Sequence, residues 1–392
     1  MRKLIVISSW FWGHILTKGI MESVFCDTLY VPPGHQLINY AYPNRRSLKR
    51  SLHMKNKKWI SLAAAIVLAV TALPMTAFAA KKDGEKKLAK VTLNEVAHSI
   101  FYAPQYVAIE EGYFAEEGLD LTLVTGFGAD KVLTALISGE ADIGFMGAEA
   151  SIYAYQEGAT DPAVNFAQLT QRAGNFLVAR EEMQDFKWED LKGKKVLGGR
   201  KGGMPEMVFE YILRKNGLDS QKDLTIDQSI DFGSTAAAFT GDKSADFTVE
   251  FEPSATALEK EGAGYVVASL GVDSGYVPYT SYSAKTSYME KNPEIIQKFT
   301  NALQKGMEYV QGHTPEEIAE VIAPQFAETD LDIVTTIVKR YYEQDTWKSD
   351  LIFEKESFEL LEDILEDAGE LNEHVSYEDL VTTEYAAKAA EK

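Results

Sequence analysis

Residues 91–156 run VTLNEVAHSIFYAPQYVAIEEGYFAEEGLDLTLVTGFGADKVLTALISGEADIGFMGAEASIYAYQ. Three short apolar runs in this stretch have the length and pattern of β-strands, at residues 91–96, 119–125 and 141–146. Apolar residues spaced one helical turn apart predict helices that begin at Pro104, after Gly128 and near Glu149. Gly118 and Gly139 end the first two helices. This β-α-β-α-β-α order predicts a parallel sheet with right-handed crossovers, and therefore an α/β fold.

A second unit of the same kind follows. Its predicted strands are residues 194–198, 224–228, 246–250 and 264–270, and its predicted helices are residues 206–216, 234–239 and 253–261. Two extended segments, 165–179 and 276–282, join the units. We therefore expect two lobes with a hinge between them, lobe 1 from 90–174 plus 281–392 and lobe 2 from 175–280. Ligands of open α/β sheets bind beyond the carboxyl ends of the strands, which places the ligand in the cleft between lobes that close by hinge motion.

The start of the chain has the pattern of an export signal. A basic segment, an apolar segment and a small-x-small site at 77–79 predict a signal peptide over residues 54–79, cleaved after Ala79. A membrane anchor is the alternative for this segment. Residues 1–53 are then a non-native extension from an over-extended start, or else an unusual leader, and residues 80–90 are a polar linker. We expect a secreted, extracytoplasmic protein.

Charge and cysteine content exclude several classes of function. The full chain has 39 basic and 59 acidic residues, and residues 1–79 hold 10 and 2 of them, which leaves a net charge of −28 for residues 80–392. Such a surface repels nucleic acid and anionic lipid. The single cysteine is Cys26, so the segment after the predicted signal has no disulfide, thiol nucleophile or lipid-anchoring cysteine. We expect a monomer with no cofactor and no metal.

Four motifs lie in order along the chain: PxxVAxxxGYFxxxGLD at 104–120, LxSGEADIG at 136–144, DLKGKKV at 190–196 and EPSATALEKEG at 252–262. Together they resemble the nitrate/sulfonate/thiamine-precursor group of solute-binding proteins of ABC importers, which includes SsuA-like and thiamine-precursor-synthase-like domains. The resemblance implies a type II periplasmic-binding-protein fold, a small-molecule ligand and permease subunits as partners. Most motif residues are glycine stops and helix-face aromatics, which favours packing over ligand contact.

The candidate ligand-binding residues lie on the turns after the predicted strands and on the second crossing. They are Ser99, Phe101, Tyr102, Phe127, Gly147, Glu149, Lys201, Gly202, Gly203, Met204, Glu250, Glu252, Tyr279 and Tyr282. The aromatic residues either sandwich a flat ring or pack between lobe and hinge. The turn at 202–205 either binds an anion or a carbonyl oxygen with free N–H groups, or is a tight strand-to-helix turn.

Glu250 stands near a position where the family often has a large aromatic residue. Glutamates in a closing cleft favour a cationic or donor-rich ligand, although a solvated strand end is the other interpretation. We therefore expect a pyrimidine-type thiamine precursor or a similar heterocycle. The alternative, a nitrate, sulfonate or taurine carrier, needs cationic donors in the cleft, for which Arg172, Arg200 and Lys201 are the candidates.

An enzyme similar to a yeast-type pyrimidine synthase is the alternative from another class. That family carries a cysteine-rich motif, which the chain after residue 79 lacks. His98, His313 and His374 are widely spaced, with no catalytic cluster around them. We therefore expect a binding protein and no catalytic residues.

Overall fold

The computed structural model describes residues 87–231 and 233–391, which belong to one compact unit, 81–392. The predicted extension, the signal peptide and most of the polar linker lie outside the described residues. Within the described part of the chain, no helix combines the length and apolar character needed to cross a membrane.

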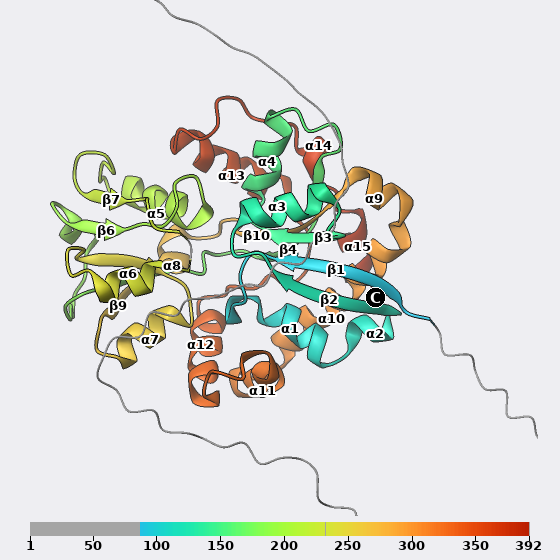
Figure 1. The fold of residues 1–392 in the computed structure, drawn as a ribbon, viewed down its shortest axis with the longest axis horizontal. Coiled ribbons are helices and arrows are strands. Elements are labelled where there is room, and N and C mark those ends of the chain that lie inside the picture. The colour runs from blue at the N-terminus through green and yellow to red at the C-terminus, as the bar shows by residue number, and fades with distance from the viewer. Residues whose placement is uncertain (1–86, 232, 392) are drawn as a thin grey trace, which may run out of the picture. The chain divides into compact units, whose positions relative to one another are not determined.

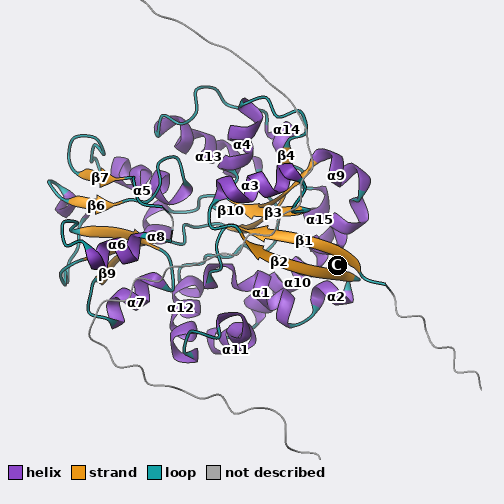
Figure 2. Cartoon of the chain, in the orientation of Figure 1, coloured by secondary structure: helices purple, strands orange, loops and turns teal. Residues whose placement is uncertain are grey.

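Two five-stranded sheets organise the described residues (Figures 1 and 2). The first has the order β2-β1-β3-β10-β4, from β1 (Ala89–Glu95), β2 (Leu119–Thr125), β3 (Ile143–Met146), β4 (Ala163–Thr170) and β10 (Thr280–Lys285). The second has the order β7-β6-β8-β5-β9, from β5 (Phe176–Ala179), β6 (Lys195–Leu197), β7 (Thr225–Asp227), β8 (Phe247–Glu250) and β9 (Tyr265–Ser269).

The two sheets share one topology. In the first sheet β1 pairs in parallel with β2 and β3, and in the second sheet β6 pairs in parallel with β7 and β8. The strand next to the third one is contributed by a crossing segment, β10 in the first sheet and β5 in the second, and it is antiparallel to both neighbours. The parallel pairing predicted for the β-α-β units is therefore confirmed. The antiparallel strands β10 and β5 are additions that the prediction did not include, because the chain returns from the opposite sheet and runs backwards through the one it enters.

Helices cover both sheets. Before the second crossing they are η1 (Ile100–Tyr102), α1 (Ala103–Glu110), α2 (Tyr113–Glu116), α3 (Ala129–Ser138), α4 (Glu149–Gln156), η2 (Trp188–Leu191), α5 (Met204–Lys215), α6 (Thr235–Gly241), α7 (Ser254–Lys260) and α8 (Leu270–Ser274). The C-terminal segment adds α9 (Thr286–Lys291), α10 (Pro293–Gly312), α11 (Pro315–Ile322), η3 (Ala323–Phe326), α12 (Leu331–Glu343), α13 (Lys355–Asp367), α14 (Tyr377–Leu380) and α15 (Glu384–Ala390).

One predicted helix is two helices in the structure. The segment from Pro104 to Gly118 breaks at Gly112, which has a φ of 76° and separates α1 from α2. A left-handed conformation inside a helical run ends the helix, and glycine adopts it without steric cost. The GYF part of the motif therefore starts a new helix whose Phe114 packs into the core, as the packing interpretation expected.

We call the part around the first sheet the first half and the part around the second sheet the second half. The C-terminal helices contact both. Helix α10 packs along α1, on the side of the first sheet, whereas α13 contacts α5 beside the second sheet. Arg340 of α12 forms ion pairs with residues of the second half, described below. This segment therefore adds a further connection between the halves, besides the two crossings.

Candidate ligand-binding site

A cavity of about 210 Å³ lies between the carboxyl ends of the parallel strands of the two sheets. From the first sheet it receives residues that follow β1, β2 and β3, including Ser99, Phe127 and Glu149. From the second it receives residues that follow β6 and β8, including Met204 and Glu252. This is the location that the strand order predicts for a ligand of an open α/β sheet.

The cavity collects most of the residues that the sequence singled out. Ten of them line it: Ser99, Tyr102, Phe127, Gly147, Glu149, Gly203, Met204, Glu250, Glu252 and Tyr279. Phe101, Lys201, Gly202 and Tyr282 are not among its lining residues.

Phe101 and Tyr282 serve packing. Phe101 is fully buried, and its ring lies 5.1 Å from that of Tyr341 and 5.6 Å from that of Phe251. Tyr282 stacks on Phe145 at 4.1 Å, and its hydroxyl donates to Gln105 Oε1 at 2.8 Å. The prediction that these two aromatic residues sandwich a ligand ring was therefore wrong, and the packing interpretation holds for both. Strand β10 points Tyr282 into the core, and η1 turns Phe101 towards α12.

Lys201 and Gly202 belong to the turn that precedes α5, but they do not line the cavity. Lys201 is exposed and pairs with Glu370 at 2.9 Å. Gly202 has a φ of 72°, and its N–H donates to Glu206 Oε2 at 3.2 Å, so this N–H is not free for a ligand. Gly203 and Met204, the next residues, do face the cavity.

Glu149 brings a buried carboxylate to the cavity from the first half. Its exposed fraction is 3%, and its Oε2 atom has no hydrogen-bond partner among the described residues. Burial raises the pKa of Glu149 to about 7, against the opposing influence of its own and Met204's N–H groups and of Arg200. Glu149 is therefore poised between its neutral and charged forms near neutral pH.

Glu250 brings a second buried carboxylate, from the end of β8. Thr248 Oγ1 donates to its Oε1 at 2.6 Å, and Thr235 Oγ1 donates to its Oε2 at 3.0 Å. Burial raises the pKa of Glu250 to about 7, although both threonine hydroxyls lower it. The interpretation of Glu250 as a solvated strand end was wrong, since its exposed fraction is 3%.

Glu252 lines the cavity, but its carboxylate is engaged elsewhere. Arg340 Nη1 lies 2.7 Å from its Oε1, and the backbone N–H of Thr256 donates to its Oε2 at 2.9 Å. The same arginine pairs with Glu259 at 2.7 Å. The backbone carbonyl of Glu252 accepts the Ser99 hydroxyl at 2.9 Å, which joins the two halves beside the cavity. Glu252 therefore has a structural role.

Aromatic residues contribute to the cavity wall, among them Tyr102, Phe127, Phe251 and Tyr279. Tyr102 is buried, with its ring 4.5 Å from that of Phe145. Tyr279 is also buried, and its hydroxyl donates to Oδ1 of Asn175, a further lining residue on the first crossing. Phe127 is 62% exposed and has a φ of 57°, so its turn presents a large apolar side chain at the cavity without burying it in the core.

Cationic groups are sparse around the cavity. Of the three candidates for anion binding, Arg200 lines it and reaches across to Asp130 at 3.9 Å. Arg172 instead donates to the Gly271 carbonyl at 3.0 Å and lies over the ring of Tyr276. With Lys201 paired to Glu370, two of the three candidates lie outside the lining of the cavity.

Sequence reasoning left out several lining residues, and His98 is the most notable of them. Its Nδ1 lies 2.8 Å from Glu95 Oε1 and its Nε2 lies 2.8 Å from the Gln325 carbonyl. The hydrogen bond to Glu95 is the largest cause that raises the pKa of His98, although burial opposes it. Tyr106 also donates to Glu95, at 2.8 Å. Only the fold brings these partners to His98, so no sequence signal revealed the network.

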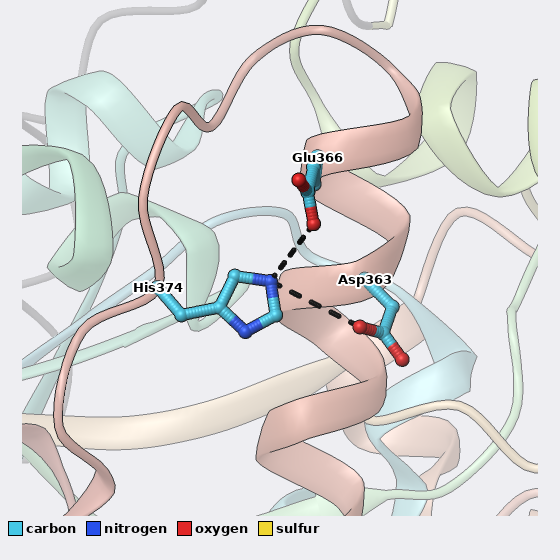
Figure 3. Close-up of side chains that lie close together, drawn as sticks. All are labelled: Asp363, Glu366 and His374. Atoms are coloured by element: carbon cyan, nitrogen blue, oxygen red, sulfur yellow. Dashed lines mark ion pairs between the residues drawn. The ribbon is translucent and has the colours of Figure 1, made fainter.

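A separate group of titratable side chains stands away from the cavity (Figure 3). His374 Nε2 lies 3.3 Å from Glu366 Oε2 and 3.9 Å from Asp363 Oδ1. All three side chains are exposed, and these contacts are ion pairs of a helix surface with the loop that follows it. Exposed pairs of this kind contribute little to stability.

Two similar halves with a cavity between them are the architecture of the periplasmic-binding-protein fold. Solved structures bear this out, although at these identities they show the fold alone. The alkanesulfonate-binding protein SsuA from Xanthomonas axonopodis pv. citri has a TM-score of 0.62 at 16% identity, covering 76% of this chain and 99% of its own. The nitrate-binding protein NrtA from Synechocystis PCC 6803 has a TM-score of 0.63 at 15% identity, covering 78% and 89%.

Sequence comparisons then give the family. The family model described as NMT1/THI5 like matches residues 100–318, and the chain belongs to this family. The putative binding protein YtlA of Bacillus subtilis (strain 168) is 45% identical over 331 residues, which cover 84% of this chain and 98% of that protein. The formylaminopyrimidine-binding protein of Halalkalibacterium halodurans is 24% identical over 72% of this chain and 83% of its own. The riboflavin-binding protein RibY of Chloroflexus aurantiacus is 25% identical, over 65% and 74%. The chain is thus a solute-binding protein.

Proposed function

We propose that the protein captures a single-ring nitrogen heterocycle of the pyrimidine type outside the cytoplasm and delivers it to the permease of an ABC importer. The observation that carries the proposal is the lining of the cavity. Glu149 and Glu250 bring one buried carboxylate from each half, and Tyr102, Phe127 and Tyr279 supply apolar ring surface. A flat ring with N–H donors at its edge matches both features.

The charge of the cavity favours this ligand over an anion. A nitrate or sulfonate requires several positive donors, and of the arginines and lysines Arg200 alone stands among the described lining residues. Two carboxyl groups with pKa values of about 7 repel an anion whenever they are ionised. A neutral or cationic ligand with N–H donors gains from the same two groups.

The size of the cavity favours one ring over several. Pockets for drug-sized ligands hold roughly 300–1,000 Å³, whereas this cavity holds about 210 Å³. A pyrimidine fits such a volume better than the three-ring system of riboflavin. One distant relative is named for riboflavin and another for formylaminopyrimidine, and the volume of the cavity supports a pyrimidine over riboflavin.

Transport and location follow from the class of protein. A binding protein of an importer acts outside the cytoplasm, which agrees with a signal peptide at 54–79. Closure of the two halves around the ligand then presents one shape to the permease and the open protein another. The bond from Ser99 to the Glu252 carbonyl is one that opening would break.

The test is calorimetric titration of the purified protein with 4-amino-5-hydroxymethyl-2-methylpyrimidine and, in parallel, with taurine. We expect saturable heat with the pyrimidine at micromolar concentrations and none with taurine. Binding of taurine without binding of the pyrimidine would falsify the proposal. Recovering the pyrimidine unchanged after incubation with the protein tests whether the protein consumes its ligand.

A further inference from the structure

The two cavity carboxylates differ in how their oxygens are satisfied. Both oxygens of Glu250 accept hydrogen bonds from threonine hydroxyls. Glu149 Oε2 accepts no hydrogen bond from the described residues, although the exposed fraction of Glu149 is only 3%. A buried charged oxygen without a donor is costly, and such groups are rare in folded proteins unless a ligand completes them.

The chain makes room for this carboxylate at one position. A Cβ atom at Gly147 would lie 1.9 Å from Glu149 Oε2 and 2.6 Å from Cδ, so any larger residue there displaces the carboxylate. Gly147 also lines the cavity, and its φ does not require glycine. Space for the Glu149 carboxylate is therefore the reason that the structure gives for a glycine at 147.

Two groups of the opposite half lower the pKa of the same carboxylate. The Met204 N–H and the charge of Arg200 both favour the ionised form of Glu149, and both residues come from the second half. The remaining groups that interact electrostatically with it are the hydroxyls of Tyr102, Tyr153 and Tyr279. Groups from across the cleft thus favour the charged form of Glu149, while its Oε2 has no hydrogen-bond donor among the described residues.

We infer that Glu149, rather than Glu250, is the specificity-determining residue of the cavity, and that its Oε2 accepts an N–H donor from the edge of the ligand ring. The inference rests on the proposed function and narrows its substrate class to heterocycles that carry an exocyclic amino group or a ring N–H. Glu250 supports the second wall through its threonines. Gly147 positions the Glu149 carboxylate.

The test measures selectivity for the amino group. Dissociation constants are determined for 4-amino-5-hydroxymethyl-2-methylpyrimidine and for the same compound without the amino group, with the wild-type protein and the Glu149→Gln, Glu250→Gln and Gly147→Ala variants. A hydrogen bond to a charged group corresponds to a preference of roughly 10- to 100-fold for the amino compound. We expect this preference in the wild type. Glu250→Gln changes a lining residue and weakens both compounds, but we expect it to keep the ratio of their two dissociation constants.

Glu149→Gln retains a weaker, neutral acceptor, so its preference for the amino compound falls by about tenfold. Gly147→Ala has the same effect with Glu149 still present. Neither result follows from a general loss of folding, which would weaken both compounds equally. An unchanged preference in Glu149→Gln with a reduced one in Glu250→Gln overturns the inference and leaves the proposed function standing. Failure of the wild type to bind either compound overturns both.

Discussion

Glu250 and Glu252 stand two positions apart at the end of one strand, yet their surroundings are opposite. Glu252 is fully paired, with Arg340 at 2.7 Å and two hydrogen bonds from Thr256. Glu250 has threonine hydroxyls but no cation, and its pKa rises to about 7. Glu149, on the opposite wall, resembles Glu250 in this respect. The Glu252 carboxylate is thus committed to its arginine, whereas Glu149 keeps an oxygen without a donor that a ligand can use.

The largest effect is expected where the paired carboxylate loses its cation. Arg340→Met leaves Glu252 buried and unpaired and removes the partner of Glu259. Breaking a buried pair by removing one partner costs about 3–5 kcal/mol. Urea unfolding at pH 7 measures this loss in the free energy of unfolding. A cost below about 1 kcal/mol, the range of exposed pairs, would show that Arg340 and Glu252 interact through solvent and would remove the contrast with Glu250.

The unpaired carboxylate should behave in the opposite way. Because burial raises the pKa of Glu149 from 4.5 to about 7, the folded state binds this proton more tightly than the unfolded state. The stability that Glu149 contributes is present below pH 4.5 and is lost as the pH rises through 7.

Glu149→Gln removes this titration. We expect the variant to be more stable than the wild type at pH 8, by up to about 3 kcal/mol, and the difference to shrink towards pH 5. Thermal unfolding at both pH values measures this difference, with Glu157→Gln, an exposed residue at the opposite end of the same helix, as the control. A variant that is less stable than the wild type at pH 8 would mean that the Glu149 carboxylate is satisfied in the folded protein.

The threonine partners of Glu250 sharpen the difference between the two walls. Thr248→Val removes the donor at 2.6 Å and keeps the shape of the side chain. We expect a loss of about 1–3 kcal/mol at pH 8, where Glu250 is mostly ionised, and a smaller loss at pH 5. Equal losses at both pH values would indicate that the hydroxyl serves packing rather than the charge.

The smallest effect is expected at the exposed contact across the cleft. Asp130 and Arg200 lie 3.9 Å apart, and about half of each side chain is exposed. Asp130→Asn should change the free energy of unfolding by no more than about 1 kcal/mol. A larger change, measured by urea unfolding in low salt, would make Arg200 a structural partner of the first half rather than a free cation at the cavity.

The amino-acid sequence predicts much of this architecture because periodicity and glycine stops are local signals. The strand at 119–125 and the helix at 149–156 have the predicted bounds. The antiparallel crossing strands were not predictable, because their direction depends on which sheet the chain returns to. The turns after the strands, together with the second crossing, located ten of the candidate residues at the cavity. Which glutamate is paired depends on Arg340, 88 positions from Glu252 along the chain, and no local pattern shows that contact.

In the proposed complex, carboxylates without a cation from both halves enclose a ring that carries an N–H donor. A crystal structure of the protein grown with 4-amino-5-hydroxymethyl-2-methylpyrimidine tests this arrangement most directly. We predict the ring in the cavity between Tyr102 and Tyr279, with its amino group within hydrogen-bond distance of Glu149 Oε2. The side chain of Glu252 should remain on Arg340. A ring bound outside this cavity, or bound in it with the amino group turned to solvent and Glu149 still without a partner, would contradict the account.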